Sequence, residues 1–201
     1  MGAEINEISK IKRTNRIKSI AIDAGHGGRD PGATAEARSA NETGGKLILE
    51  KDLNLRLGAE LFGQALEAGF EAYLLRGGDY DLALTSRAEL ANQYGVDLFL
   101  SVHHNGAASS QASGTETLYY PGSKTGQALA GLVQKAMVAR LGLTDRGIKS
   151  QDNLHLLKAT KMAAILIEPL FLTGARDQTL LETDDYFKNL ARAVIAGLIG
   201  L

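Results

Sequence analysis

Residues 17–30, with the sequence IKSIAIDAGHGGRD, join an apolar run to a glycine-rich turn that carries a histidine. The run Ile17–Asp23 is short and rich in isoleucine, which favours a β-strand. Glycines at positions 25, 27 and 28 follow it and favour a tight turn. We therefore predict a strand over Ile17–Asp23 whose carboxyl end presents His26.

Strand-like and helix-like segments alternate along the rest of the chain. The helices that we predict are Glu50–Ala68, Leu84–Tyr94, Lys124–Leu141 and Asp184–Ile199, and the further strands are Glu71–Leu75, Asp97–Val102, Thr115–Tyr120, Leu154–Leu157 and Ala164–Ile167. Asp79 or Asp81 could cap the second helix. This alternation predicts a three-layer α/β fold, in which a central, mostly parallel sheet is flanked by helices on both faces.

The composition is that of an ordinary globular domain. The 201 residues include 22 Lys and Arg against 23 Asp and Glu, so the net charge of -1 argues against a nucleic-acid-binding protein. The sequence has no apolar run long enough for a transmembrane helix. Cysteine is absent, which excludes a disulfide framework, a thiolate zinc site and a cysteine nucleophile.

Residues 1–17 differ from the remainder because they are polar and become basic towards their end. They lack the apolar segment of a secretory signal peptide. We expect residues 1–17 to form a flexible leader and residues 18–201 to form a single domain.

Four polar residues stand where one edge of the predicted sheet could bring them together. His26 and His103 follow the first and third predicted strands, and Glu168 follows Ala164–Ile167. Glu50 opens the long helix. In α/β folds, functional groups gather at the carboxyl ends of the strands. Two imidazoles and a carboxylate suit a catalytic zinc ion, and a separate carboxylate such as Glu168 could then carry a proton.

Each of these residues alone has another interpretation. The glycine-rich turn could be only a tight turn or a phosphate cradle. Glu50 could merely complement the helix dipole. At most one of His103 and His104 is expected to point into a site, because successive strand residues face opposite sides. His155 could be a satisfied or exposed histidine, or it could border the cleft.

Several motifs together resemble the zinc-dependent N-acetylmuramoyl-L-alanine amidases of the Amidase_3 family. The segments DAGHGG (23–28) and DPGA (30–33) resemble its opening motif, and EKDLNL (50–55) resembles its second motif. The later motifs follow in the family's order: Arg76, Leu84, Arg87, Ala91 and Asn92, then DLFLSVHHN (97–105), GTETLYY (114–120) and ILIE (165–168). The resemblance extends from about Lys18 to Leu201.

This resemblance implies a fold and a reaction. It implies a sheet of about six strands, one Zn²⁺ ion per chain held by His26, Glu50 and His103, and Glu168 as the catalytic acid and base. The substrate implied is peptidoglycan, cleaved at the amide between the lactyl group of N-acetylmuramic acid and L-alanine. Three residues inside the histidine motifs are expected to contact substrate, namely Arg29, His104 and Asn105.

The sequence departs from the family pattern in three places. His104 stands where a small residue is usual, and Pro169-Leu170 follows the glutamate where a glycine or another small residue is usual. Only about ten residues join the His103 strand to the Thr115 strand, which leaves no room for the inhibitory helix of some members. We therefore expect a short, unregulated, monomeric enzyme that acts in the cell wall, the periplasm or outside the cell.

Three rival functions can be compared with this one. A metallopeptidase would share the site but cut the stem peptide elsewhere. A non-catalytic peptidoglycan-binding module would be expected to have lost some of the four polar residues, and all four are present. A nucleotide-binding protein could use the turn at Gly25–Gly28, but the sequence lacks both the P-loop and the dinucleotide-binding glycine patterns.

Overall fold

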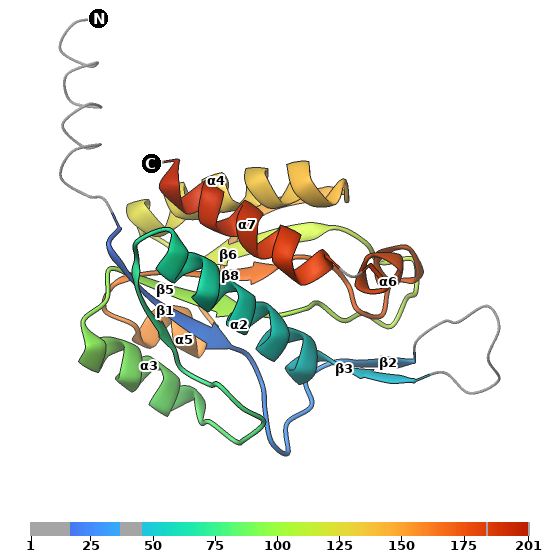
Figure 1. Ribbon diagram of the computed structural model, residues 1–201, viewed down its shortest axis with the longest axis horizontal. Coiled ribbons are helices and arrows are strands. Elements are labelled where there is room, and N and C mark those ends of the chain that lie inside the picture. Colours follow the sequence, from blue (N-terminus) through green and yellow to red (C-terminus); the bar gives the residue numbers. More distant parts are fainter. Residues whose placement is uncertain (1–16, 37–45, 184, 201) are drawn as a thin grey trace, which may run out of the picture.

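A central sheet lies between two layers of helices in the computed structural model, which describes residues 17–36, 46–183 and 185–200 (Figure 1). The sheet has six strands in the order β4-β1-β5-β8-β6-β7. Their bounds are Glu71–Leu74, Ser19–Ala24, Leu98–Val102, Ala163–Glu168, Thr115–Tyr119 and Asp145–Ser150 in that order. All neighbouring strands are parallel except β8 and β6. The predicted mostly parallel α/β sheet is confirmed.

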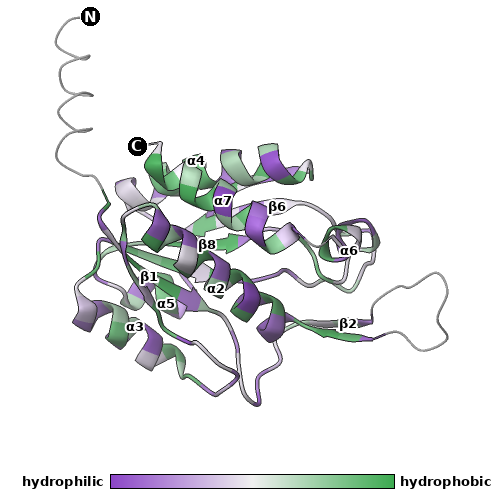
Figure 2. Cartoon of the chain, viewed as in Figure 1, coloured by the Kyte–Doolittle hydropathy of each residue, from purple (hydrophilic) through white to green (hydrophobic). Residues whose placement is uncertain are grey.

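The helices cover both faces of the sheet. The helices α2 (Glu50–Glu67), α4 (Lys124–Leu141) and α7 (Tyr186–Ile199) pack together on one face. On the other face lie α3 (Leu84–Tyr94) and the short α5 (His155–Ala159). Figure 2 shows the central strands as largely hydrophobic and the helices as hydrophilic on parts of their outer surfaces.

The alternation of side chains along the strands divides the core into two parts. Ile20 and Ile22 of β1 contribute to the cluster under α2, α4 and α7, whereas Ala21 contributes to the cluster under α3 and α5. β5 behaves in the same way, with Leu100 on the first side and Phe99 on the second. Because the central strands are buried on both faces, they are apolar throughout, except for a few polar groups near their carboxyl ends.

A small hairpin positions the start of α2. The strands β2 (Thr34–Glu36) and β3 (Leu47–Leu49) pair in antiparallel fashion and lead directly into the helix. The backbone N–H of Glu50 donates to the Ala33 carbonyl at 2.9 Å, and that of Lys51 donates to the Pro31 carbonyl at 3.1 Å. The first turn of α2 is thereby attached to the loop that follows β1.

One predicted strand is wrong, and several elements of the structure were not predicted. Leu154–Leu157, predicted as a strand, is the approach to α5 and its first turn, and the sixth strand is instead β7. Short apolar runs do not by themselves distinguish a strand from a buried helical turn. The hairpin and the helix α6 (Ala175–Leu181) were not predicted.

The predicted leader and the predicted helix caps can be compared with the structure in the same way. The proposed leader over residues 1–17 lies outside the described residues except for Ile17, which packs in the core. Residue 184, where the last helix was predicted to begin, also lies outside the described residues. Neither Asp79 nor Asp81 caps α3, whose N-cap is Ala83 without a side-chain hydrogen bond. Within the described part of the chain, no helix is long and apolar enough to span a bilayer.

Candidate active site

The turn after β1 holds His26 in a left-handed backbone conformation. Its φ angle is +62°, which is uncommon for a residue other than glycine. The ring Nδ1 of His26 lies 2.8 Å from a carboxylate oxygen of Asp30, four residues further on. This bond favours the tautomer in which Nδ1 carries the hydrogen, so Nε2 is available as a ligand atom.

Two buried arginines fix this turn from beneath. Arg76 is fully buried and donates to backbone carbonyls within residues 24–26, at 3.0 and 3.1 Å. Arg87 donates to carbonyls of the same turn at 2.7 Å and pairs with the buried Asp23 at 2.5 Å. Because guanidinium groups donate in a rigid planar fork, they hold the turn in one conformation. Both arginines belong to the motifs in the sequence, but their contacts could not be derived from it.

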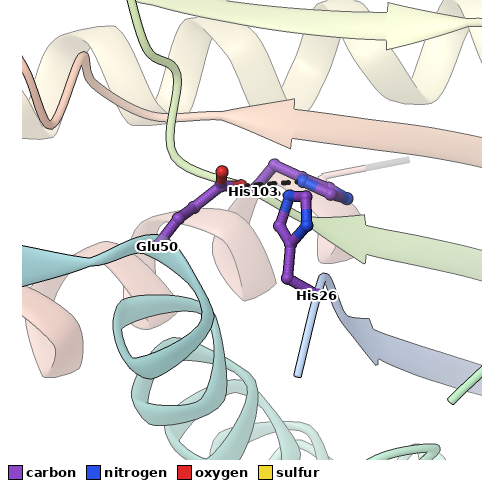
Figure 3. A group of neighbouring side chains, drawn as sticks. All are labelled: His26, Glu50 and His103. Carbon is purple, nitrogen blue, oxygen red and sulfur yellow. Dashed lines mark hydrogen bonds and ion pairs between the residues drawn. The ribbon is translucent and has the colours of Figure 1, made fainter. Parts of the chain in front are cut away.

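Glu50 lies at the centre of the site, at the first turn of α2 (Figure 3). Its Oε1 atom is 3.1 Å from Nε2 of His26 and 2.8 Å from Nδ1 of His103. The Oε2 atom accepts a hydrogen bond from the Ala33 backbone at 2.8 Å, and the Asn54 amide donates to Oε1 at 3.1 Å. Burial alone would raise the pKa of Glu50, but its bonds to the two imidazoles lower it well below the usual range.

His103 reaches the site from the carboxyl end of β5. Its backbone N–H donates to the Ile167 carbonyl at 3.0 Å, which fixes it against β8. The imidazole meets that of His26 edge-on, with 4.9 Å between the ring centroids. A Cβ atom at Gly25 would overlap the His103 ring, so this position of the turn requires glycine.

The donor atoms of three side chains converge as the sequence predicts. Ligand atoms of His26, Glu50 and His103 all lie within 4.8 Å of one another. For His26, burial alone would lower the pKa, but hydrogen bonds and charges of Glu50 and Asp30 raise it. Two imidazoles and a carboxylate packed so closely fit a divalent ion that takes nitrogen and oxygen ligands.

Glu168 ends β8 at the same edge of the sheet. Val102 pairs with Ile167 across β5 and β8, so His103 and Glu168 follow at equivalent positions of adjacent strands. Glu168 is half-buried, but its Oε2 atom is fully buried and has no hydrogen-bond partner among the described residues. Burial first, and then the charges of Glu50 and Glu116, raise its pKa well above the usual value.

Among the residues expected to contact substrate, His104 is buried. The structure does not support such a role for His104, because the residue is 1% exposed and its ring bonds to Asn54 at 2.8 Å and to the Tyr186 hydroxyl at 3.0 Å. Burial lowers the pKa of His104 to about 4, so the ring is a neutral part of the core. His155 is exposed at the start of α5 and is not part of the donor group.

Arg29 and Asn105 both lie on loops beside the site. The side chain of Arg29 is exposed and pairs with Asp81 at 2.8 Å. The side-chain amide of Asn105 donates to Glu116 at 3.1 Å. Glu116 and Asp30 were not among the expected site residues, although Asp30 stands within the quoted motif, four positions after His26.

These features define a class of protein. A carboxylate–imidazole donor group lies beside a glutamate whose buried oxygen has no hydrogen-bond partner in the described part of the chain, and this arrangement at the carboxyl edge of an α/β sheet is that of a metal-dependent hydrolase. The model of the family described as N-acetylmuramoyl-L-alanine amidase, Amidase_3, matches residues 20–200. The chain belongs to this family.

Relatives and solved structures agree with this assignment. The chain is 33% identical over 184 residues to YqiI of Bacillus subtilis (strain 168), with 90% of this chain and 83% of YqiI covered. It is 32% identical over 185 residues to the N-acetylmuramoyl-L-alanine amidase LytC of the same organism, covering 90% of this chain but 35% of LytC. The crystal structure of an N-acetylmuramoyl-L-alanine amidase from Clostridium difficile 630 is 31% identical, with a TM-score of 0.80, and 92% of this chain and 96% of that chain are covered.

Proposed function

We propose that this protein is a zinc-dependent N-acetylmuramoyl-L-alanine amidase that hydrolyses the amide between the lactyl group of N-acetylmuramic acid and L-alanine in peptidoglycan. The observation that carries the proposal is the Glu168 carboxyl, whose buried Oε2 atom has no partner among the described residues, beside the group formed by His26, Glu50 and His103 in a chain of this family. One group is suited to holding a metal ion, and the other is suited to carrying a proton.

His26, Glu50 and His103 are the residues that we expect to hold one Zn²⁺ ion, and the absence of thiolates leaves nitrogen and oxygen as the ligands. When bound, zinc supplies a Lewis acid for the substrate carbonyl and lowers the pKa of a water molecule towards about 7. Asp30 orients the His26 ring, and the Asn54 amide orients the Glu50 carboxylate.

Glu168 is the proposed acid and base. A carboxylate oxygen of Glu168 takes a proton from the attacking water and later gives it to the nitrogen of the departing L-alanine. The raised pKa, caused mainly by burial, makes the Glu168 carboxylate a stronger base than an exposed glutamate and so favours the first step. The proposed zinc ligands and Glu168 all lie at one edge of a single sheet, and we propose one catalytic domain over residues 18–201 that acts as a monomer.

The substrate determines where such an enzyme acts. The Bacillus subtilis LytC is an N-acetylmuramoyl-L-alanine amidase, and a further relative, from Bacillus phage SPP1, is an endolysin. We propose that this protein acts on peptidoglycan of the cell wall, in the wall or periplasm or outside the cell.

The test is digestion of purified peptidoglycan, followed by mass spectrometry of the products. We expect stem peptides that begin with a free L-alanine amine and glycans that keep the lactyl group. A chelator should abolish their formation, and added Zn²⁺ should restore it. Peptides cut at other bonds would instead indicate a metallopeptidase, and a zinc-loaded protein that releases no peptide would contradict the proposed hydrolysis.

A further inference from the structure

An irregularity in β7 brings two basic side chains to the same side of the sheet. Residues three apart in a regular strand face opposite sides. Between β6 and β7, however, the register shifts by one residue, from Thr115 opposite Asp145 to Thr117 opposite Ile148. Gly147, with a φ angle of +76°, lies inside this bulge. Arg146 and Lys149, on its two sides, therefore reach the same point.

That point is the carboxylate of Glu116 on β6. Its Oε2 atom accepts from Nε of Arg146 at 2.7 Å and from Nζ of Lys149 at 2.6 Å. Its Oε1 atom accepts from the Asn105 amide at 3.1 Å. We call Glu116, Arg146 and Lys149 the basic cluster; these three side chains together carry two positive charges and one negative charge.

The basic cluster lies beside the proposed proton carrier. Glu116 is the direct cross-strand neighbour of Glu168 in the β6–β8 pair. The Arg146 guanidinium lies over the ring of Phe171, three residues after Glu168, with 4.8 Å between its carbon and the ring centroid. Both basic side chains are thus held at the edge of the sheet where hydrolysis is proposed.

Arg146 and Lys149 have N–H donors beyond those that bind Glu116. The side chains of Arg146 and Lys149 are 37% and 39% exposed, whereas that of Glu116 is 9% exposed. Among the described residues, Arg146 donates only through Nε and Lys149 makes one bond. One of the two cations would neutralise Glu116. The second cation, with the free end of the arginine fork, is suited to a carboxylate from outside the protein.

We propose that Arg146 and Lys149, held by Glu116, form a subsite for a carboxylate of the stem peptide, namely that of the residue following L-alanine. The inference rests on the proposed function and extends it to substrate recognition. The glycan near the scissile amide is uncharged, so a basic subsite favours the peptide side of the bond. Glu168 gives its proton to the L-alanine nitrogen, and the next residue carries the nearest carboxylate.

Two synthetic muramoyl peptides would test the proposal. Both contain L-alanine followed by a γ-linked D-glutamate residue and end in a C-terminal amide. They differ only at the α-position of that residue, which is a carboxylate in one and a carboxamide in the other. The variants are Arg146→Gln and Lys149→Met. The matched controls are Arg192→Gln on α7 and Lys135→Met on α4, which change exposed basic residues on helices.

We expect the unaltered protein to cleave the carboxylate peptide with a kcat/KM about tenfold higher than the carboxamide peptide, the size of one charge-assisted hydrogen bond. The preference should appear mainly in KM, should weaken in high salt, and should disappear in both variants but in neither control. Because the carboxamide peptide should be cleaved equally by all proteins, it reports correct folding. Equal cleavage of both peptides by the unaltered protein would overturn the subsite.

Calorimetric binding of the two released dipeptide products separates this inference from the proposed function. If neither muramoyl peptide is cleaved but the carboxylate dipeptide binds about tenfold more tightly, and Arg146→Gln removes the difference, the subsite stands and the proposed reaction fails. If both dipeptides bind alike, the subsite is wrong whatever the activity.

Discussion

Glu50 and Glu168 stand at the same edge of one sheet, yet the protein treats their carboxyl groups in opposite ways. Glu50 accepts bonds from backbone and amide groups and contacts two imidazoles, and its pKa is lowered. Glu168 has a buried oxygen without a partner among the described residues, and its pKa is raised. Identical side chains thus acquire different chemistry from their surroundings: one is kept ionised and suits a metal ligand, and the other is poised to exchange a proton.

Replacing Glu50 should have the largest effect. In Glu50→Gln, the charge that draws the two imidazoles together is lost, and we expect neither stoichiometric zinc nor measurable amidase activity. Elemental analysis of the purified protein and the peptidoglycan digest measure the two properties. Asp52→Asn is the matched control, because Asp52 is the other acidic residue of the same helical turn and is exposed. A Glu50→Gln variant that retained zinc at full occupancy would remove Glu50 from the ligand set.

Replacing Glu168 should separate metal binding from turnover. Glu168→Gln keeps the shape of the side chain but cannot carry the proton, so we expect kcat to fall by about 10²–10⁴-fold. Zinc content should remain that of the unaltered protein, because Glu168 is not in the donor group. Stopped assays of a muramoyl peptide at saturating zinc measure kcat. Full activity in this variant would show that another group moves the proton.

Asp30 is expected to act on the metal through His26. In Asp30→Ala, the imidazole loses the partner that sets its tautomer, and we expect zinc affinity to fall by about 10–100-fold. At saturating zinc, kcat should return close to its original value, because Asp30 does not contact Glu168. Competition with a chromophoric chelator measures the affinity. An unchanged zinc affinity would mean that the turn alone orients His26.

Much of this arrangement was predictable from the sequence, because central strands leave a strong signal. β1, β5 and β8 are buried on both faces and therefore appear as apolar runs. In a parallel sheet, the carboxyl ends of the strands meet at one edge, which is why the sequence predicts that His26, His103 and Glu168 lie close together.

The missed features lack such a signal. The strand β7 reads DRGIKS, because it lies at the edge of the sheet and contains a bulge, so neither an apolar run nor alternation marks it. For the same reason, the sequence does not predict that Arg146 and Lys149 lie side by side. His104 shows a different limit: a polar residue next to a ligand appears functional, and only its contacts with Asn54 and Tyr186 identify it as part of the core.

The smallest predicted effect concerns stability and follows from the raised pKa of Glu168. Burial raises this pKa above its ordinary value of 4.5, so the folded protein binds a proton more tightly than the unfolded chain. The stability contributed by the neutral carboxyl is therefore complete below pH 4.5 and declines as the pH rises towards the folded-state pKa, by at most about 1.4 kcal/mol per pH unit.

Glu168→Gln removes this dependence, because the amide does not titrate. In the metal-free protein, we expect the variant to be more stable than the unaltered protein at pH 7, with the difference vanishing by about pH 4. Urea unfolding of both proteins at the two pH values measures it, and Glu182→Gln, at an exposed position, should show no such change. If the unaltered protein were as stable as the variant at pH 7, the carboxylate of Glu168 would be solvated or paired in the folded state. The contrast would then rest on Glu50 alone, whose carboxylate is held by two imidazoles and by backbone and amide donors.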